Sequence, residues 1–392
     1  MNNVEKEFVH SIINTLKSVL PKKEYIPLHE PEFGGNEWEY VKDCLDSGWV
    51  SSVGDYVDRF EQILCDYTGS PYAVASVNGT AALHICLLLT GVQAGDEVLV
   101  PAVTFIATAN AVTYCNAIPH FVDVEERTLG LDPNKLNDYL REISEFRGNI
   151  CYNRFTGRPI RAVVPMHTFG HPVDIDPLQE LCERYHLVMV EDAAESLGSL
   201  YKGQHTGTRG LVSSLSFNGN KTITTGGGGA ILTNSKSITK RAKHMTTQAK
   251  TPHRWEFNHD MVGYNYRMPN INAALGCAQL EQLPGFIEKK RNLARRYQEA
   301  FQDIPGIRFF KEPDFARSNY WLNVLILDEE FARERDNLLE STNNAGIMTR
   351  PLWRLMHKLA MYRDCPRMDL SIAESLESRV INIPSGAYLG KI

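Results

Sequence analysis

The chain has 392 residues, of which 43% are hydrophobic and 22% charged, and its formal net charge is −6. These shares are close to those of soluble globular proteins, and the length suits two to three domains. A mildly negative charge argues against nucleic acid or an anionic membrane as the main partner. Since no apolar run reaches the roughly 18 residues of a membrane span and the first residues do not resemble a signal peptide, we expect a soluble, cytoplasmic protein.

The first 20 residues carry apolar side chains at helical spacing, which predicts one amphipathic helix that ends before Pro21. Such a stripe either packs on its own chain or forms an arm toward a second copy or a membrane surface. The apolar positions are Val4, Phe8, Ile12, Ile13, Leu16, Val19 and Leu20.

From residue 72 onward, short apolar runs alternate with helical segments. This alternation predicts βαβ units and a mainly parallel sheet, with ligands bound at the carboxyl ends of the strands. A polar, turn-rich segment between Leu140 and Ile160 predicts an insertion with a hairpin around Thr156–Gly157. The expected strands cover 72–77, 97–101, 118–124, 162–166, 187–190, 215–217 and 230–232, and the expected helices cover 81–89, 106–115 and 178–185.

The last hundred residues differ in pattern from the alternating region. From about Arg291 a long charged helix is followed by short mixed elements, which predicts a smaller α+β domain. The eight cysteines are widely spaced and include no CxxC pair. We therefore expect reduced, mostly buried thiols rather than disulfides or a structural metal.

Three motifs in the alternating region contain residues that suit ligand binding or catalysis. In the first, Asn78, Gly79 and Thr80 stand where a strand ends and a helix begins. Free N–H groups and the positive end of a helix dipole suit a phosphate there, and Thr80 adds a hydroxyl. The same residue types are also ordinary helix caps, so this motif alone is a weak signal.

The second motif is acidic: Glu191, Asp192 and Glu195 follow an apolar strand. An acid at the carboxyl end of a strand lies where α/β active sites form, and beside a cation it can hold a proton on a ring nitrogen. A capping pair for the next helix is the alternative interpretation.

The third motif is a lysine in an uncharged run. Lys221 lies among small and apolar residues and is followed by Gly226 to Gly229. A desolvated lysine is a usable amine nucleophile, although a surface loop is the plainer alternative. The order of lysine and glycines is not that of a P-loop.

The three motifs together favour pyridoxal phosphate (PLP) as the cofactor. Its phosphate needs a helix N-terminus and hydroxyls, its ring nitrogen needs a carboxylate, and its aldehyde needs an amine. Asp192 stands 29 residues before Lys221, and Ser216 stands five residues before it.

The chain resembles the DegT/DnrJ/EryC1/StrS family of sugar-nucleotide aminotransferases. This resemblance implies an aspartate-aminotransferase-like α/β fold of type I, with a seven-stranded, mainly parallel sheet. We expect a helical extension over 1–26, a large PLP domain over 27–250 and a small α+β domain over 251–392. The matching segments are 78–84, 95–112, 120–125, 163–176, 188–199, 207–210, 216–233 and 263–276.

The resemblance also implies roles for the chemical groups. Lys221 would form the Schiff base with the cofactor and move protons, and Asp192 would pair with the pyridine nitrogen. Glu195 stands where the family usually has Gln or His near the ring hydroxyl, so that contact stays open. Because the dehydratase branch of the family has histidine in place of this lysine, Lys221 favours transamination.

Further roles concern binding. Gly79, Thr80 and Ser216 would hold the phosphate, and Phe105 would stack on the ring unless it is a core aromatic. Asn265 matches an asparagine that reaches the phosphate from the neighbouring subunit, which implies a homodimer with shared active sites.

Substrate contacts are expected near the C-terminus. Arg350 and Arg354, near Trp353, lie where family members meet the nucleotide-sugar, and such groups suit diphosphates and bases. The basic stretch between Lys236 and Arg254 is interpreted as a solvated helix face, with diphosphate attraction as the alternative.

The N-terminal helix and the turn-rich insertion resemble a subgroup that aminates C4 of UDP-linked 4-keto-6-deoxy-N-acetylhexosamines. That subgroup serves legionaminic-acid or bacillosamine-type pathways. The resemblance therefore implies transfer of an amino group from an amino acid, expected to be L-glutamate, to UDP-2-acetamido-2,6-dideoxy-4-ketohexose. The alternatives are a PLP-dependent sugar-nucleotide dehydratase or lyase, and a sugar-nucleotide-binding protein without catalysis.

Overall fold

The computed structural model describes residues 3–391, with side chains from residue 7 onward, so that of Val4 lies outside the described part. Within that range, no helix combines the length and the apolar character needed to cross a membrane.

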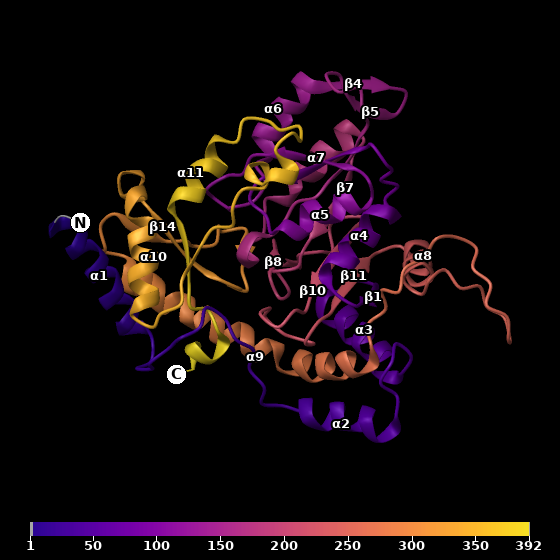
Figure 1. Ribbon diagram of the computed structural model, residues 1–392, viewed down its shortest axis with the longest axis horizontal. Helices are drawn as coiled ribbons and strands as arrows, with labels where there is room; N and C mark the ends of the chain where they lie inside the picture. The colour runs from indigo at the N-terminus through magenta and orange to yellow at the C-terminus, as the bar shows by residue number, and fades with distance from the viewer. Residues whose placement is uncertain (1–2, 392) are drawn as a thin grey trace.

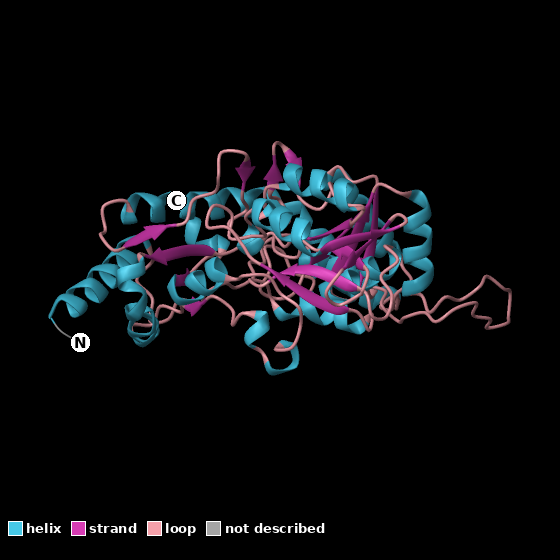
Figure 2. Cartoon of the chain, turned by 90° about the horizontal axis from the view of Figure 1, so that it is seen from above, coloured by secondary structure: helices cyan, strands magenta, loops and turns pink. Residues whose placement is uncertain are grey.

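A seven-stranded sheet forms the centre of the larger part of the molecule (Figures 1 and 2). Strands β10, β7, β6, β2 and β3 are parallel, whereas β11 runs antiparallel to both of its neighbours. The predicted mainly parallel sheet is therefore confirmed. In spatial order the strands are β1 (Tyr72–Ser76), β11 (Gly229–Thr233), β10 (Val212–Ser216), β7 (Val188–Asp192), β6 (Ile160–Val163), β2 (Glu97–Pro101) and β3 (Ile118–Val122).

Helices cover both faces of this sheet. On one face α4 (Gly79–Leu89), α5 (Ile106–Tyr114) and α8 (Lys236–Thr246) pack on Val98, Val100 and Val190. On the other face α6 (Pro133–Ile143) and α7 (Ile175–Tyr185) pack on Leu99, Val163 and Met189. Because both faces are covered, strands such as β2 and β11 are buried along their whole length and contain apolar runs rather than an alternating pattern.

The smaller part contains a four-stranded antiparallel sheet. Its strands, in spatial order, are β12 (Ile307–Phe309), β14 (Asn323–Leu327), β16 (Val380–Ile383) and β15 (Arg350–Pro351). Helix α10 (Arg335–Asn344) packs against β15 and β16, and helix α11 (Ser371–Arg379) packs against β14. A separate three-stranded sheet joins β13 (Ala316–Arg317), β8 (Leu200–Tyr201) and β9 (Gln204–His205).

The N-terminal helix α1 (Asn3–Val19) packs on its own chain (Figure 1). Ile12 and Leu16 are fully buried in one core with Tyr297, Leu325 and other residues of the C-terminal region. The apolar stripe is therefore interior surface of the small part rather than a free arm. The predicted limits at 26/27 and 250/251 stay predictions.

The long helix α9 (Asn270–Phe301) connects the two parts and begins about 20 residues before the expected start at Arg291. Its first half packs with α3 (Asp55–Thr68) and lies beside α2 (Glu37–Ser47), and its second half packs with α1. The first half was missed because it is rich in Ala and Leu and poor in charge, so its pattern is not that of a charged surface helix.

The insertion has the predicted turn at Thr156–Gly157, where the Asn153 N–H donates to the Arg158 carbonyl at 2.8 Å and Tyr152 forms an antiparallel bridge with Pro159. It also contains a longer hairpin that the sequence did not predict. The paired strands are β4 (Ser144–Arg147) and β5 (Ile150–Asn153), and Gly148 takes the left-handed conformation at their turn, with φ of 62°. The predicted turn leads into β6, and the Thr156 hydroxyl donates to the buried Glu97 carboxylate at 2.6 Å. The sequence offered turn signals at both places and did not distinguish them.

Candidate active site

A cavity of about 290 Å³ opens at the carboxyl ends of β7 and β10. The chain brings side chains from the three motifs together here, although Asn78 and Lys221 lie 143 positions apart in the sequence. Eight of the predicted site residues line it: Gly79, Thr80, Phe105, Asp192, Glu195, Ser216, Lys221 and Trp353.

The start of α4 forms one wall of the cavity. The Asn78 side chain caps this helix by accepting a hydrogen bond from the Ala81 N–H at 2.7 Å. A Cβ at Gly79 would lie 2.7 Å from the Ser216 Cβ, so only glycine lets the helix start approach the end of β10 this closely. The arrangement presents backbone N–H groups and two hydroxyl side chains, which is the donor set that a phosphate needs.

Asp192 ends β7 and is buried at the base of the cavity. Its carboxylate accepts hydrogen bonds from the Thr108 hydroxyl at 2.8 Å and the Ala194 N–H at 3.2 Å. Burial raises the pKa of Asp192, against the lowering effect of these donors and of Lys221. A cation placed on this carboxylate would hold it ionised. Thr108 was missed by sequence reasoning, although it lies one turn after Phe105 in a segment that resembles the family.

Lys221 reaches the opposite side of the cavity. Its Nζ lies 3.3 Å from Glu195 Oε1 and 3.9 Å from the centroid of the Trp321 ring. The Trp321 indole N–H donates to the Asn220 carbonyl at 2.7 Å, which fixes the ring beside the lysine. Trp321 was also missed, since it belongs to a loop about 100 residues after the lysine and no spacing links the two.

Glu195 is fully enclosed and holds two partners. Its Oε2 accepts the Phe169 N–H at 2.9 Å, while its Oε1 faces Lys221. Burial raises the pKa of Glu195 to about 7, although Lys221 lowers it.

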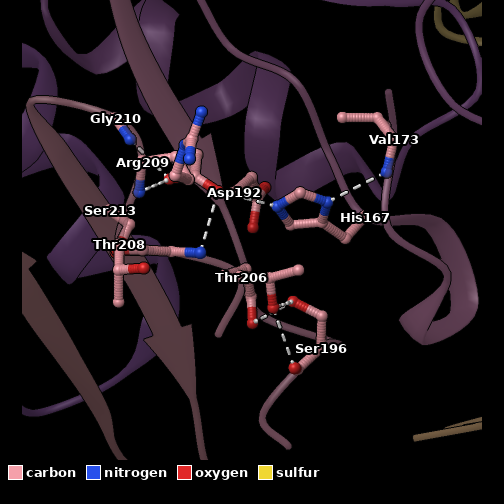
Figure 3. A network of polar contacts seen from close by, with 12 residues as sticks. His167, Val173, Asp192, Ser196, Thr206, Thr208, Arg209, Gly210 and Ser213 are labelled. Atoms are coloured by element: carbon pink, nitrogen blue, oxygen red, sulfur yellow. Dashed lines mark hydrogen bonds and ion pairs between the residues drawn. The ribbon is translucent and has the colours of Figure 1, made fainter. Parts of the chain in front are cut away.

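A second polar network supports the end of β7 (Figure 3). The Glu191 carboxylate is fully buried and accepts the backbone N–H groups of Gly207, Arg209 and Gly210 at 2.6–2.8 Å. It also accepts from His167 Nε2 at 3.0 Å. The segment after β9 is thereby folded around the residue that precedes Asp192.

The two histidines of the 167–171 segment do not converge. His167 is hydrogen-bonded to Glu191, whereas His171 lies between the rings of Phe310 and Tyr320. Burial lowers the pKa of His171 to about 3. Each imidazole is thus part of the packed interior.

The remaining predicted residues take separate positions. Phe105 is 50% exposed at the mouth of the cavity, 6.2 Å from the Trp353 ring, so its interpretation as a core aromatic is wrong. Arg350 lines a second cavity that adjoins the first. Asn265 is exposed, pairs with Thr247 and does not line the cavity of its own chain.

The residues present fit PLP. One cavity is surrounded by a helix start with hydroxyls, a buried carboxylate and a lysine. Gly79 leaves room for a phosphate at the helix start, where a Cβ would collide with Ser216. Together with the fold, this arrangement defines the class of type I PLP-dependent aminotransferases. The model of the DegT/DnrJ/EryC1/StrS aminotransferase family matches residues 31–391, and the chain belongs to this family.

Relatives and solved structures agree with this assignment. The chain is 40% identical to a GDP-perosamine synthase of Escherichia coli O157:H7 over 92% of this chain and 93% of that protein. It is 37% identical to the GDP-perosamine synthase of Vibrio cholerae over 92% and 94% of the two chains. A DegT DnrJ EryC1 StrS aminotransferase from Brucella abortus has a similar structure, with a TM-score of 0.82, 26% identity and coverage of 90% and 91%.

Proposed function

We propose that the enzyme transfers an amino group from L-glutamate to C4 of a nucleotide-linked 4-keto-6-deoxy sugar. The observation that carries this proposal is the arrangement of Lys221, Asp192 and the start of α4 around one cavity. PLP bound there supplies an electron sink and carries the amino group between donor and acceptor.

The side chains of the chain itself account for the proton movements. Asp192 would lie at the ring nitrogen of the cofactor and, as a carboxylate, would keep that nitrogen protonated. Lys221 Nζ would serve as the general acid and base that moves a proton between the substrate carbon and the cofactor. Glu195 Oε1 lies 3.3 Å from Lys221 Nζ and orients this amine, while the Trp321 ring shields the amine from water.

For the sugar, we place UDP-2-acetamido-2,6-dideoxy-4-ketohexose first. The features behind this choice are α1 and the β4–β5 hairpin, which resemble the N-acetylhexosamine subgroup. The family model begins at residue 31, so α1 stands outside the part that the family has in common. A GDP-linked 4-keto-6-deoxyhexose is the second candidate, because several relatives at 37–40% identity are named GDP-perosamine synthase.

We also propose a homodimer in which Asn265 completes the partner's phosphate site. Two observations support it: Asn265 is exposed away from its own cavity, and the loop before it projects from the body of the molecule (Figures 1 and 2). This loop exposes large apolar side chains that a second copy could cover, namely Trp255, Phe257, Met261 and Val262.

The test is a panel of 4-keto-6-deoxy sugar nucleotides with glutamate as donor. The masses of the products identify the sugar and the nucleotide, and formation of 2-oxoglutarate separates transamination from a lyase or dehydratase. A binding protein without catalysis would give neither. Lys221→Ala should retain bound cofactor yet lose sugar amination, and amination at the wild-type rate would refute the role of Lys221.

A further inference from the structure

Asn319 is a fully buried asparagine in the loop between β13 and β14, and both ends of its amide are hydrogen-bonded. Its Oδ1 accepts the Trp321 N–H at 2.8 Å. Its Nδ2 donates to the backbone carbonyls of Glu195 and Leu197, each at 2.9 Å, and lies 3.3 Å from Thr222 Oγ1. One amide thus joins a loop of the small part to the segment after β7 and to the segment after β10.

The residues that this amide holds are the neighbours of Lys221 Nζ. Glu195 Oε1 lies 3.3 Å from this nitrogen, and the centroid of the Trp321 ring lies 3.9 Å from it. Thr222 is the next residue in the chain, and the Lys221 side chain is 13% exposed. The distances between Nζ and its two neighbours therefore depend on how the Asn319 amide spaces their backbones.

The surroundings of Asn319 allow its amide one favourable orientation. Turning the amide over would place its NH₂ group against the Trp321 N–H and its oxygen against two carbonyls. A Cβ at Gly170 would lie 1.9 Å from Asn319 Oδ1, so the space around the oxygen is also filled. The backbone N–H of Asn319 donates to Ser199 Oγ at 2.9 Å. Because a buried polar network with all its groups paired is rigid, this amide can fix the positions of its partners.

Trp321 has two further anchors. Its carbonyl accepts from Nζ of the fully buried Lys290 at 3.2 Å, and its indole N–H donates to the Asn220 carbonyl at 2.7 Å. Asn319 differs from both anchors, because its amide also holds the segment that carries Glu195. Loss of this amide would therefore loosen both sides of the space around Lys221.

We propose that Asn319 is a positioning residue for Lys221, since it holds the Trp321 ring and the Glu195 carboxyl on two sides of Nζ. Asn319 does not line the cavity and acts only through these neighbours. The proposal rests on the role of Lys221 in the proposed function. Because a misplacement of about 1 Å can slow a reaction about 100-fold, loss of Asn319 should affect the rate more than the binding of substrate.

The first measurement is the glutamate half-reaction of the holoenzyme, followed through the absorbance of the bound cofactor. In Asn319→Ala we expect the rate constant at saturating glutamate to fall by about 10- to 100-fold. The concentration of glutamate at half saturation should change by less than about threefold, because Asn319 is not expected to contact the donor.

The second measurement needs no turnover. The full chain without cofactor is treated with formaldehyde and a hydride donor, and methylation of Lys221 is measured by mass spectrometry relative to that of the exposed Lys311. In Asn319→Ala this relative methylation should rise by about three- to tenfold, because Nζ is no longer enclosed by fixed neighbours.

Asn153→Ala is the matched control. Asn153 is also a buried asparagine whose Oδ1 accepts the N–H of the second residue after it, that of Phe155 at 3.0 Å. Its Nδ2 donates to the Glu97 carboxylate at 2.9 Å, and it belongs to β5, outside the lining of the cavity. We expect this variant to lose stability in urea yet to keep the methylation of Lys221 and the half-reaction rate within about twofold of the wild type.

Thr222→Val removes one partner of the Asn319 amide and keeps the amide itself. It should raise the methylation of Lys221 by about twofold, and it should add nothing to Asn319→Ala, because both changes act on one contact. If Asn319→Ala does not fold, Thr222→Val supplies the test, and unchanged methylation in it overturns the proposal.

The remaining outcomes separate this inference from the function on which it rests. Wild-type methylation and rate in Asn319→Ala overturn the inference, and so does an equal rise of methylation in Asn153→Ala, which would show general loosening. A loss confined to the half-saturating concentration of glutamate would assign Asn319 to donor binding and would likewise overturn it. Amination at the wild-type rate by Lys221→Ala overturns the proposed function instead, and the methylation of the Asn319 variant then still shows whether Asn319 holds this side chain.

Discussion

Replacing Glu191 by glutamine removes one charge from the interior and leaves the shape of the side chain unchanged. The carboxylate accepts four hydrogen bonds, two on each oxygen: Gly207 N–H and His167 Nε2 on one, and Arg209 N–H and Gly210 N–H on the other. The Val173 N–H donates to His167 Nδ1 at 3.3 Å, so the proton of this imidazole is on Nε2. All four partners of Glu191 are therefore donors.

A glutamine amide cannot satisfy this set in either orientation. Its NH₂ group would face two donors, and each buried donor without an acceptor costs about 1–3 kcal/mol. We therefore expect Glu191→Gln to lower the free energy of unfolding by about 2–5 kcal/mol, allowing for partial relaxation of the loop. The same contacts explain the lowered pKa of Glu191: burial alone raises it, but the hydrogen bond from His167 and the backbone donors outweigh burial.

The assay is urea unfolding at matched protein concentration, combined with hydrogen exchange of the amides at Gly207, Arg209 and Gly210. Exchange at these three amides should become faster relative to the rest of the sheet. Glu180→Gln on the exposed side of α7 is the control and should change stability by less than about 0.5 kcal/mol. A loss below about 1 kcal/mol in Glu191→Gln, with unchanged exchange, would refute the reasoning.

Three further predictions address other parts of the molecule. Leu16→Ala should lower the free energy of unfolding by about 2–5 kcal/mol in urea, because this side chain is fully buried; a loss similar to that of an exposed residue would show that α1 is not part of the core. Thr108→Val removes the hydroxyl that donates to Asp192 and should weaken cofactor binding about tenfold in an absorbance titration, with unchanged affinity as the contrary result. His171→Leu should make stability less dependent on pH. The pKa of His171 is about 3 in the folded chain against 6.5 unfolded, so the unfolded state binds one more proton between these values and stability is lost as the pH falls. Removing the group should reduce the slope of unfolding free energy by about 1.4 kcal/mol per pH unit within that window, and an unchanged slope would contradict this account.

The strands and the chemical groups could be predicted from the sequence because each has a local signature. The strand 97–101 was found with its correct limits, since a buried parallel strand is a short apolar run between breakers. Lys221 and Asp192 were recognisable because a lysine in an uncharged run and an acid after an apolar strand are unusual as residue patterns.

Partners that depend on tertiary packing had no such signature. Trp321 meets Lys221 only because the loop before β14 lies against the cavity, and an isolated tryptophan in a sequence does not indicate its neighbours. The hairpin turn at Gly148 was missed because glycine at 148 and at 157 gives the same local signal, and only one turn was expected in this segment.

The continuity of α9 has a mechanical consequence. Its residues up to Ile287 belong to the core around α3, and those from Leu293 onward belong to the core around α1. Pro284 lies inside this helix and has no N–H to donate to the carbonyl one turn earlier, and Gly285 follows it on the exposed side. Glycine is also among the poorest helix formers. Bending the helix therefore requires the least energy at this pair, one turn before the boundary between these two cores.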